Sequence, residues 1–242
     1  MRAHRALGLA LHGRFDDAER ALFRSRRSEE AAWVHAYIAA ARGEFARARA
    51  QASPLATGAR TRSIRVAAGL TLASVLRQKG KHRAARPYDR AALAAARTDA
   101  ERAHALIGLA ADAIGLGRAA VCAARLAEAA AVAPAGDWRV QVRLDWVRTE
   151  HALATGRPRA ALPPARRALR RARREDAVRH VAKSHLFLGA ALAESGDRGA
   201  ALREMNAALR RARACGAAPL ADVARAMLAR AVRARDGADV AG

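Results

Sequence analysis

The stretch from Leu188 to Leu209, LGAALAESGDRGAALREMNAAL, decides the fold of this chain of 242 residues. Apolar residues recur at helical spacing on both sides of Gly196, with Leu188 and Leu192 before it and Ala201 after it. A glycine between two such patterns is typical of a tight turn, because a residue without a Cβ adopts the left-handed conformation at a helix end without steric cost. The stretch therefore predicts a helix, a tight turn and a second helix.

The same signal, a glycine followed five residues later by a small residue, occurs six times along the chain. The pairs are Gly13 with Ala18, Gly43 with Ala48, Gly80 with Ala85, Gly117 with Cys122, Gly156 with Ala161, and Gly196 with Ala201. Successive glycines are 30, 37, 37, 39 and 40 residues apart. One helical hairpin cannot bury its own apolar face, so this regular succession predicts an all-α, right-handed solenoid of six helix pairs and a closing helix.

Capping and helix-breaking residues set the expected boundaries. Thr98 with Glu101 has the spacing of a capping box, and Asp137 is placed to cap the next helix. Pro54 lies in what we expect to be the longest linker, residues 52–62. We expect a single domain over residues 1–236. Its repeats are predicted at about 2–26, 28–56, 61–97, 99–133, 137–174 and 177–214, its closing helix at 218–235, and a flexible tail at 237–242.

The composition agrees with a helical protein of high positive charge. Hydrophobic residues make up 52% of the chain but aromatic residues only 4%, and alanine, the best helix former, is by far the commonest residue. An all-β or doubly wound α/β fold is therefore not expected. Lysine and arginine number 45 against 22 aspartates and glutamates, which gives a net charge of +23. An excess of this size points to a basic surface or to an acidic partner.

The residues around Gly196 resemble the tetratricopeptide repeat family, whose pattern has L-G on the first helix and A, F and A on the second, with a late Pro. The matching residues are Leu188-Gly189, Leu192, Ala201 and Ala208-Leu209 in the sixth unit, Leu72-Ala73, Leu76 and Ala85 in the third, and Leu109-Ala110, Cys122, Ala129 and Pro134 in the fourth. The first two units match through Phe15 and Phe45, while the fifth departs from the pattern with Arg148-Thr149 in place of L-G. The long units are also similar to the helical repeats in sensor regions of MalT-type transcription activators.

The tetratricopeptide resemblance implies a concave groove, lined by the first helix of each unit, that takes a peptide or a helix of a partner protein. Counted back from each turn glycine, the groove residues would be Trp33, Tyr37, Arg77, His104, Arg143, Trp146, Glu150 and Lys183. We expect Trp146 to be an exposed anchor that contributes little to stability. Core packing is the alternative for Trp33 and Trp146. The only asparagine, Asn206, lies on a second helix, so the Asn and Lys clamp by which some family members hold a carboxylate is not expected.

Two long blocks carry charges of one sign. No acidic residue occurs from Phe45 to Tyr88 or from His151 to Arg174. In the second block an apolar stripe predicts that six arginines face solvent or a partner, namely Arg166, Arg167, Arg170, Arg171, Arg173 and Arg174. This patch suits an acidic protein segment, nucleic acid or an anionic membrane, or it is simply a solvated face. The scarcity of aromatic residues in both blocks disfavours single-stranded nucleic acid.

Signatures of catalysis, cofactor binding and metal binding are not found in a suitable context. Gly115, Gly117 and Ala120 spell G-x-G-x-x-A, but they follow a helix, whereas a dinucleotide site needs a preceding strand. The eight histidines form no H-E-x-x-H, and His180 and His185 are five residues apart, so they do not share a helical face. We therefore predict no catalytic residue, no cofactor and no metal site.

The remaining sequence features concern location and function. Charged residues interrupt the apolar stretch from Met1 to Phe15, so we expect no secretion signal, and the uncharged run from Ala103 to Ala111 is too short to cross a bilayer. Two distant cysteines, Cys122 and Cys215, fit the reducing cytoplasm. The sequence predicts a noncatalytic protein-interaction scaffold and leaves its oligomeric state open. The alternatives are a sensor domain for a small effector and a basic nucleic-acid-associated protein.

Overall fold

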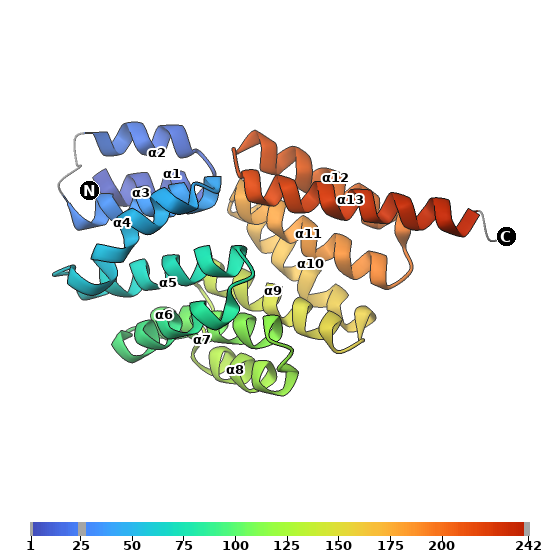
Figure 1. Cartoon of the computed structure of the whole chain (residues 1–242), viewed down its shortest axis with the longest axis horizontal. Coiled ribbons are helices and arrows are strands. Elements are labelled where there is room, and N and C mark those ends of the chain that lie inside the picture. Colours follow the sequence, from blue (N-terminus) through green and yellow to red (C-terminus); the bar gives the residue numbers. More distant parts are fainter. Residues whose placement is uncertain (1, 24–27, 240–242) are drawn as a thin grey trace.

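The computed structural model describes residues 2–23 and 28–239, which form helices and short turns with no strand in those two ranges. The helices are α1 (Arg2–Leu11), α2 (Phe15–Leu22), α3 (Glu29–Arg42), α4 (Phe45–Gly58), α5 (Arg62–Gln78), α6 (His82–Ala95), α7 (Asp99–Gly115), α8 (Ala119–Val132), α9 (Trp138–Ala154), α10 (Pro158–Arg174), α11 (Val178–Glu194), α12 (Arg198–Ala214) and α13 (Ala218–Asp239). Consecutive helices pack as antiparallel hairpins (Figure 1). The fold is an α-solenoid, as the sequence predicts.

The six turn glycines confirm the predicted hairpins. All of them have a positive φ, between +67° for Gly80 and +91° for Gly196, and Gly216 makes a seventh such turn before α13. The small residue five positions after each of the six glycines is buried, with at most 1% of its surface exposed. A small side chain at this point lets the two helices of a hairpin approach closely, as the repeat signal indicates.

The predicted caps form, but two predicted boundaries are wrong. Thr98 and Glu101 make a full capping box, and the Asp137 carboxylate accepts hydrogen bonds at the start of α9. The linker expected at residues 52–62 is largely helix, because α4 runs through Pro54 to Gly58. Pro54 and Ala50 are both exposed, so water can solvate the carbonyl that loses its helical partner. Helix α13 continues to Asp239, beyond the predicted start of the tail, whereas residues 24–27 and 240–242 lie outside the described residues.

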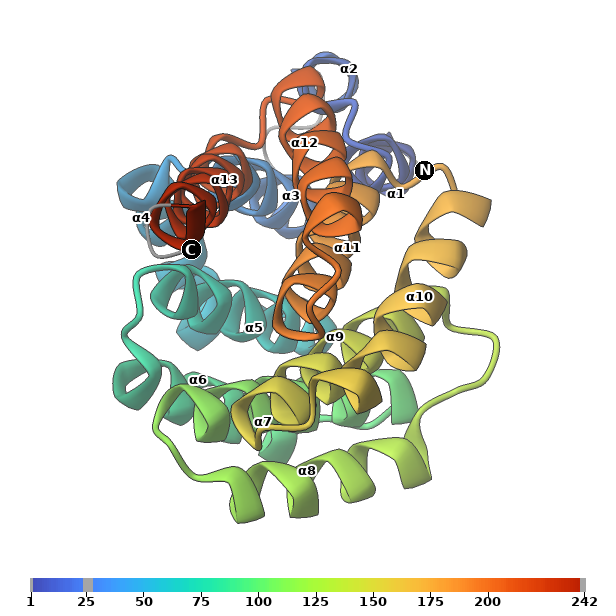
Figure 2. The ribbon, with the colours of Figure 1, turned by 90° about the vertical axis from the view of Figure 1, so that its right-hand side faces the viewer.

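The odd-numbered helices form the continuous inner layer of the solenoid. Each of them from α1 to α11 contacts the next odd-numbered helix as well as its hairpin partner. Apolar side chains of successive units share one cluster, as Ile107 of α7 does with Val140 and Leu144 of α9. Seen end-on, the helices form a ring, with α8 and α10 at its periphery (Figure 2). The polar side chains of the inner layer therefore come from successive repeats.

The superhelix returns to its own start. Helix α13 contacts α3, although more than 170 residues separate them. Gly43, at the end of α3, lies against the ring of Pro219, and Gly13 lies against Cys215 and Val178. The first two turn glycines are thus covered by residues of the last units, and the row of helices closes on itself at α3 and α13.

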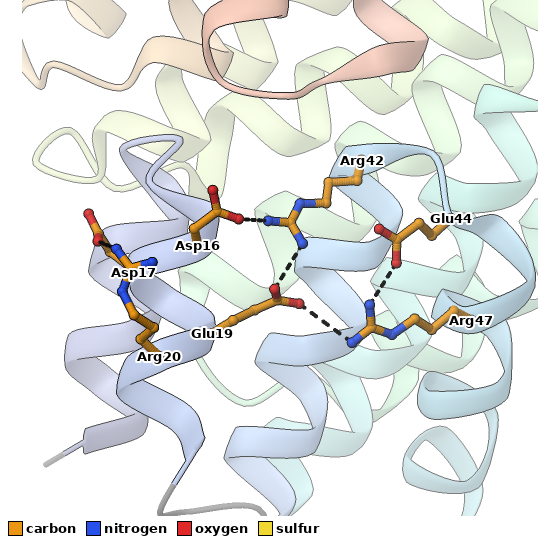
Figure 3. Close-up of polar contacts among 7 residues, drawn as sticks. All are labelled: Asp16, Asp17, Glu19, Arg20, Arg42, Glu44 and Arg47. Carbon is orange, nitrogen blue, oxygen red and sulfur yellow. Dashed lines mark hydrogen bonds and ion pairs between the residues drawn. The ribbon is translucent and has the colours of Figure 1, made fainter.

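Ion pairs tie the first unit to the second (Figure 3). Arg42 at the end of α3 binds Glu19 of α2 at 2.9 Å and also pairs with Asp16. Arg47 of α4 reaches the same Glu19 at 3.5 Å. Because these side chains are partly exposed, each pair contributes roughly 0 to 1 kcal/mol, and together they orient α2 on its neighbours.

The closure of the ring predicts a different cost for two equivalent glycines. A Cβ added to Gly43 would lie 2.8 Å from Pro219 Cγ, whereas a Cβ added to Gly156 would meet no atom within 4 Å. Both substitutions strain a left-handed backbone, by roughly 1 to 2 kcal/mol, but only Gly43→Ala also pushes α13 away from α3. We expect urea denaturation to show that Gly43→Ala is about 2 kcal/mol more destabilising than Gly156→Ala. Equal losses for the two variants would contradict the closed ring.

Candidate functional site: the inner face

The eight predicted groove residues all lie on odd-numbered helices, and we call this surface the inner face. Helix α3 carries Trp33 and Tyr37, α5 carries Arg77, α7 carries His104, α9 carries Arg143, Trp146 and Glu150, and α11 carries Lys183. Seven of them are half-buried, and Trp146 is buried. Charged groups of different repeats interact on this surface, since the charges of Tyr37 and Arg77 both affect the pKa of Arg143. The fold therefore brings side chains from five successive repeats to one surface.

Trp146 is not the exposed anchor that the sequence suggested. Only 5% of its surface is exposed, and its indole Nε1 donates a hydrogen bond to Ser184 Oγ at 2.9 Å. His180 stacks on the ring with centroids 5.5 Å apart, Phe187 stacks at 6.0 Å, and the Lys183 ammonium lies 4.6 Å from the ring centre. The expectation failed because α9 packs directly on α11 and the indole fills the space between two repeats. Trp146 is a core residue beneath the inner face.

Trp33 has a related position between the second and third repeats. Its Nε1 donates to Thr71 Oγ1 of α5 at 3.1 Å, and its ring centroid lies 6.4 Å from that of Tyr37. Because part of both rings stays exposed, Trp33 and Tyr37 form the aromatic part of the inner face.

Arg77 forms ion pairs with two buried carboxylates that the sequence analysis did not identify. Its guanidinium pairs with Asp89 and binds Asp112 at 3.2 Å, and both aspartates are fully buried. Burial raises the pKa of each carboxyl, against the opposing charge of Arg77. A Cβ on Gly108 would lie within 2.6 Å of the Asp89 carboxylate, so the carboxylate needs a glycine at that point of α7. Arg77 thus links two repeats through ion pairs, and the two carboxylates already balance its charge.

Four other cations of the inner face have no carboxylate partner within 4.0 Å among the described residues. They are Arg139 and Arg143 on α9, and Arg179 and Lys183 on α11. Sequence reasoning found Arg143 and Lys183 but missed Arg139 and Arg179. The signal was present, because the 40-residue spacing of Gly156 and Gly196 maps Arg139 onto Arg179 and Arg143 onto Lys183.

Crowding of these cations changes their acid–base behaviour. Burial and the nearby charge of Arg179 lower the pKa of Lys183 to about 7, against the pull of Glu150. Burial and the charges of Arg77 and Arg139 lower the pKa of Arg143 to about 10. Burial and neighbouring cations also hold the pKa of His104 and of His180 well below the ordinary value, so both imidazoles are neutral at pH 7. Neutral His104 accepts a hydrogen bond from Arg143 at 2.8 Å.

The six arginines predicted to line one surface of α10 fall into two groups. Arg166, Arg170, Arg173 and Arg174 are exposed. Arg167 and Arg171 instead bind the fully buried carboxylate of Asp145, Arg167 at 2.9 Å. The expectation that all six face solvent or a partner is wrong for these two, because Asp145 of α9 lies directly beneath them and completes its coordination with Arg148 at 3.4 Å.

A separate cavity of about 260 Å³ lies between α6, α7 and α8. Its lining combines apolar residues, among them Leu93, Leu109 and Leu116, with arginines from α6 and α8. Its volume falls slightly below the roughly 300 to 1,000 Å³ of typical small-molecule sites.

Metal ligands and membrane-spanning helices were sought in the same way. Within residues 2–23 and 28–239, no three His, Cys, Asp or Glu side chains gather to hold a metal ion. In that part of the chain no helix combines the length and apolarity needed to cross a membrane. Cys122 and Cys215 are free thiols, both buried, and burial raises the pKa of Cys122 to about 12.

Comparison with known proteins places the fold but not the family. No protein-family model matches the sequence, and no curated protein matches it. Among solved structures, the crystal structure of the apo form of RapI aligns with 99% of this chain and 71% of its own, with a TM-score of 0.51 and 11% sequence identity. Since so low an identity shows the fold alone, the likeness establishes a helical repeat architecture.

Proposed function

We propose that this chain is a noncatalytic interaction scaffold of the tetratricopeptide type, which holds a peptide or helix of a partner protein on its inner face. The observation that carries the proposal is the inner face itself. Five successive first helices carry partly exposed charged and aromatic side chains on one surface, and no carboxylate of the described residues lies within 4.0 Å of four of the cations there. A helical repeat gives such a surface length and curvature, which suit an extended ligand.

The packing of Gly189 supports the tetratricopeptide register. A Cβ at Gly189 would lie 3.0 Å from Met205 Cγ and 3.4 Å from the Ala201 carbonyl oxygen. The L-G position of the pattern thus faces the second helix of its own hairpin at close range, and its neighbour Leu188 is buried in the core. The buried free thiols support a location in the reducing cytosol.

A second candidate function is a regulatory domain that binds a small effector. The cavity between α6, α7 and α8 favours it, because an apolar lining beside arginines suits a small anionic amphiphile. The inner face is the better supported site, since it collects polar groups from more repeats.

Site-specific photocrosslinking tests the proposed function. Ser74 of α5 takes the inner-face position that Tyr37 takes in α3, whereas Ala127 is exposed on the outer helix α8. Because the native thiols are buried, a benzophenone maleimide should label Ser74→Cys or Ala127→Cys selectively. In a nuclease-treated lysate of the source cells, we expect Ser74→Cys to crosslink a discrete polypeptide with at least about tenfold higher yield. Equal yields, or a preference for Ala127→Cys, would place the partner elsewhere.

A further inference from the structure

The inner face carries four cations, two on each of two neighbouring helices, because the same two positions are basic in consecutive repeats. We call these four residues the array. Arg139 and Arg143 are four residues apart on α9, and Arg179 and Lys183 are four residues apart on α11. The two helices are neighbours in the inner layer. Side chains four apart share one helix face, so each helix presents its two cations side by side. His104 extends the row of Arg143 and Lys183 into the preceding repeat and hydrogen-bonds to Arg143.

This array lacks the buried carboxylates that balance other arginines at the contacts between helices. Arg77 rests on Asp89 and Asp112, and the arginines of α10 that turn inward rest on Asp145. Around the array, the charge of Glu150 acts on Lys183 and that of Asp89, already paired with Arg77, acts on Arg143, but neither carboxylate forms a salt bridge with these cations. The array therefore differs from Arg77 and from Arg167 and Arg171, whose charges are each balanced by a buried carboxylate.

Buried hydrogen-bonding atoms of the array also lack partners. The Nε atoms of Arg139 and Arg179 and the Nδ1 atom of His180 are buried and make no hydrogen bond to any described residue. An unpaired buried donor is unfavourable and uncommon in folded proteins, and it marks a place where an acceptor from outside is expected. Two of these atoms belong to the array, and His180 is buried beneath it, between Trp138 and Trp146.

We propose that the inner face between α9 and α11 binds an acidic, extended segment of a partner protein, whose carboxylates pair with Arg139, Arg143, Arg179 and Lys183. This inference rests on the proposed function and specifies the chemistry of the partner. Charge-assisted hydrogen bonds from guanidinium groups to carboxylates satisfy the donors that the chain leaves unpaired.

The spacing of the array suits an extended chain better than a single small anion. Four residues of helix rise by about 6 Å, and packed helices lie roughly 8 to 10 Å apart. An extended peptide rises about 3.3 Å per residue, so acidic residues two positions apart match the spacing along a helix and residues three apart match the spacing between helices. One carboxylate or one phosphate cannot reach all four cations.

Nucleic acid is the less suitable occupant. Single-stranded nucleic acid is held by aromatic rings that are free to stack on bases. Here the faces of Trp146 are already covered by His180, Phe187 and Lys183. The contact of α3 with α13 closes the row of inner helices, and this curvature disfavours a rigid duplex.

The test compares two matched pairs of substitutions in the full chain. The inner variant carries Arg139→Gln and Arg143→Gln, and the outer variant carries Arg166→Gln and Arg170→Gln. Each removes two arginines four residues apart on one helix, and the outer pair is exposed on α10. The probe is a fluorescein-labelled peptide of ten glutamates, measured by fluorescence anisotropy at 150 mM salt. A peptide of ten alternating glutamines and serines, a ten-nucleotide oligothymidylate and inorganic phosphate are the comparison ligands.

We expect the inner variant to bind the glutamate peptide about 30-fold more weakly than the unaltered protein, and the outer variant less than threefold more weakly. Because the inner pair repels but Arg143 also donates a hydrogen bond to His104, these contributions offset each other, and we expect the melting temperature to change by less than about 3 °C. Equal losses in the two variants, or tighter and inner-face-dependent binding of oligothymidylate or phosphate, would each overturn the proposal. If Ser74→Cys still crosslinks selectively while the glutamate peptide fails, the scaffold function stands and the acidic partner is wrong.

Discussion

Replacing Trp146 by alanine is expected to lower the melting temperature by about 10 °C. The indole is 5% exposed, stacks on His180 and Phe187, and donates its N–H to Ser184. Truncating a buried tryptophan costs roughly 3 to 5 kcal/mol, because apolar contact is lost and a cavity remains. For a chain of this size, 1 kcal/mol corresponds to about 2 to 4 °C. Differential scanning calorimetry measures the shift directly.

Trp146→Phe is the matched control. Phenylalanine keeps an aromatic ring between His180 and Phe187 but loses the hydrogen bond to Ser184 Oγ, which contributes about 1 kcal/mol. We therefore expect a shift of about 2 to 4 °C for this variant. A melting temperature that stays unchanged in Trp146→Ala, together with weaker capture of a partner, would return the residue to the exposed position that the sequence alone suggested.

The sequence predicts the hairpins well because their determinants are local. A turn glycine such as Gly196 and the small residue that follows it, Ala201, are five residues apart, and both act within one hairpin. The capping box of Thr98 and Glu101 is local in the same way. Such signals need no knowledge of the rest of the chain, so the order and type of the helices follow from the sequence.

Features that depend on contacts between repeats are less accessible to sequence reasoning. The pattern places Trp146 on the first helix of its unit, but only the packing of α9 on α11 decides that the ring is buried. The meeting of Gly43 with Pro219 depends on the summed curvature of all units, which no single repeat specifies. Pro54 indicated a break, yet an exposed helix face tolerates it.

The positions of the arginines also depend on contacts between helices, which the sequence does not reveal. Counting charges along α10 predicts one basic surface, whereas Asp145, 22 residues before Arg167, draws Arg167 and Arg171 inward. The opposite side of α9 carries Arg139 and Arg143 without such a carboxylate. Helix α9 thus separates arginines that are neutralised within the fold from arginines that are left for a partner.

Replacing Asp145 by asparagine should destabilise the fold by about 3 kcal/mol, since removing one member of a buried ion cluster leaves its partners uncompensated. Asp145 is fully buried, while Arg148, Arg167 and Arg171 are each 35 to 38% exposed, so water offsets part of the loss. The melting temperature should fall by about 6 to 12 °C. Denaturation in urea gives the free energy of unfolding for comparison.

A surface pair of the same chemistry provides the control for Asp145→Asn. Asp222 pairs with Arg225 on α13, and the two side chains are 63% and 56% exposed, so Asp222→Asn should cost less than about 0.5 kcal/mol. A double-mutant cycle then isolates the buried cluster, because Arg171→Gln should cost about 1 to 2 kcal/mol in the unaltered chain and almost nothing once Asp145 is asparagine. If Arg171→Gln lowers the free energy of unfolding equally in both backgrounds, Asp145 does not bind that arginine. The two sides of α9 would then not differ in the way that the structure indicates.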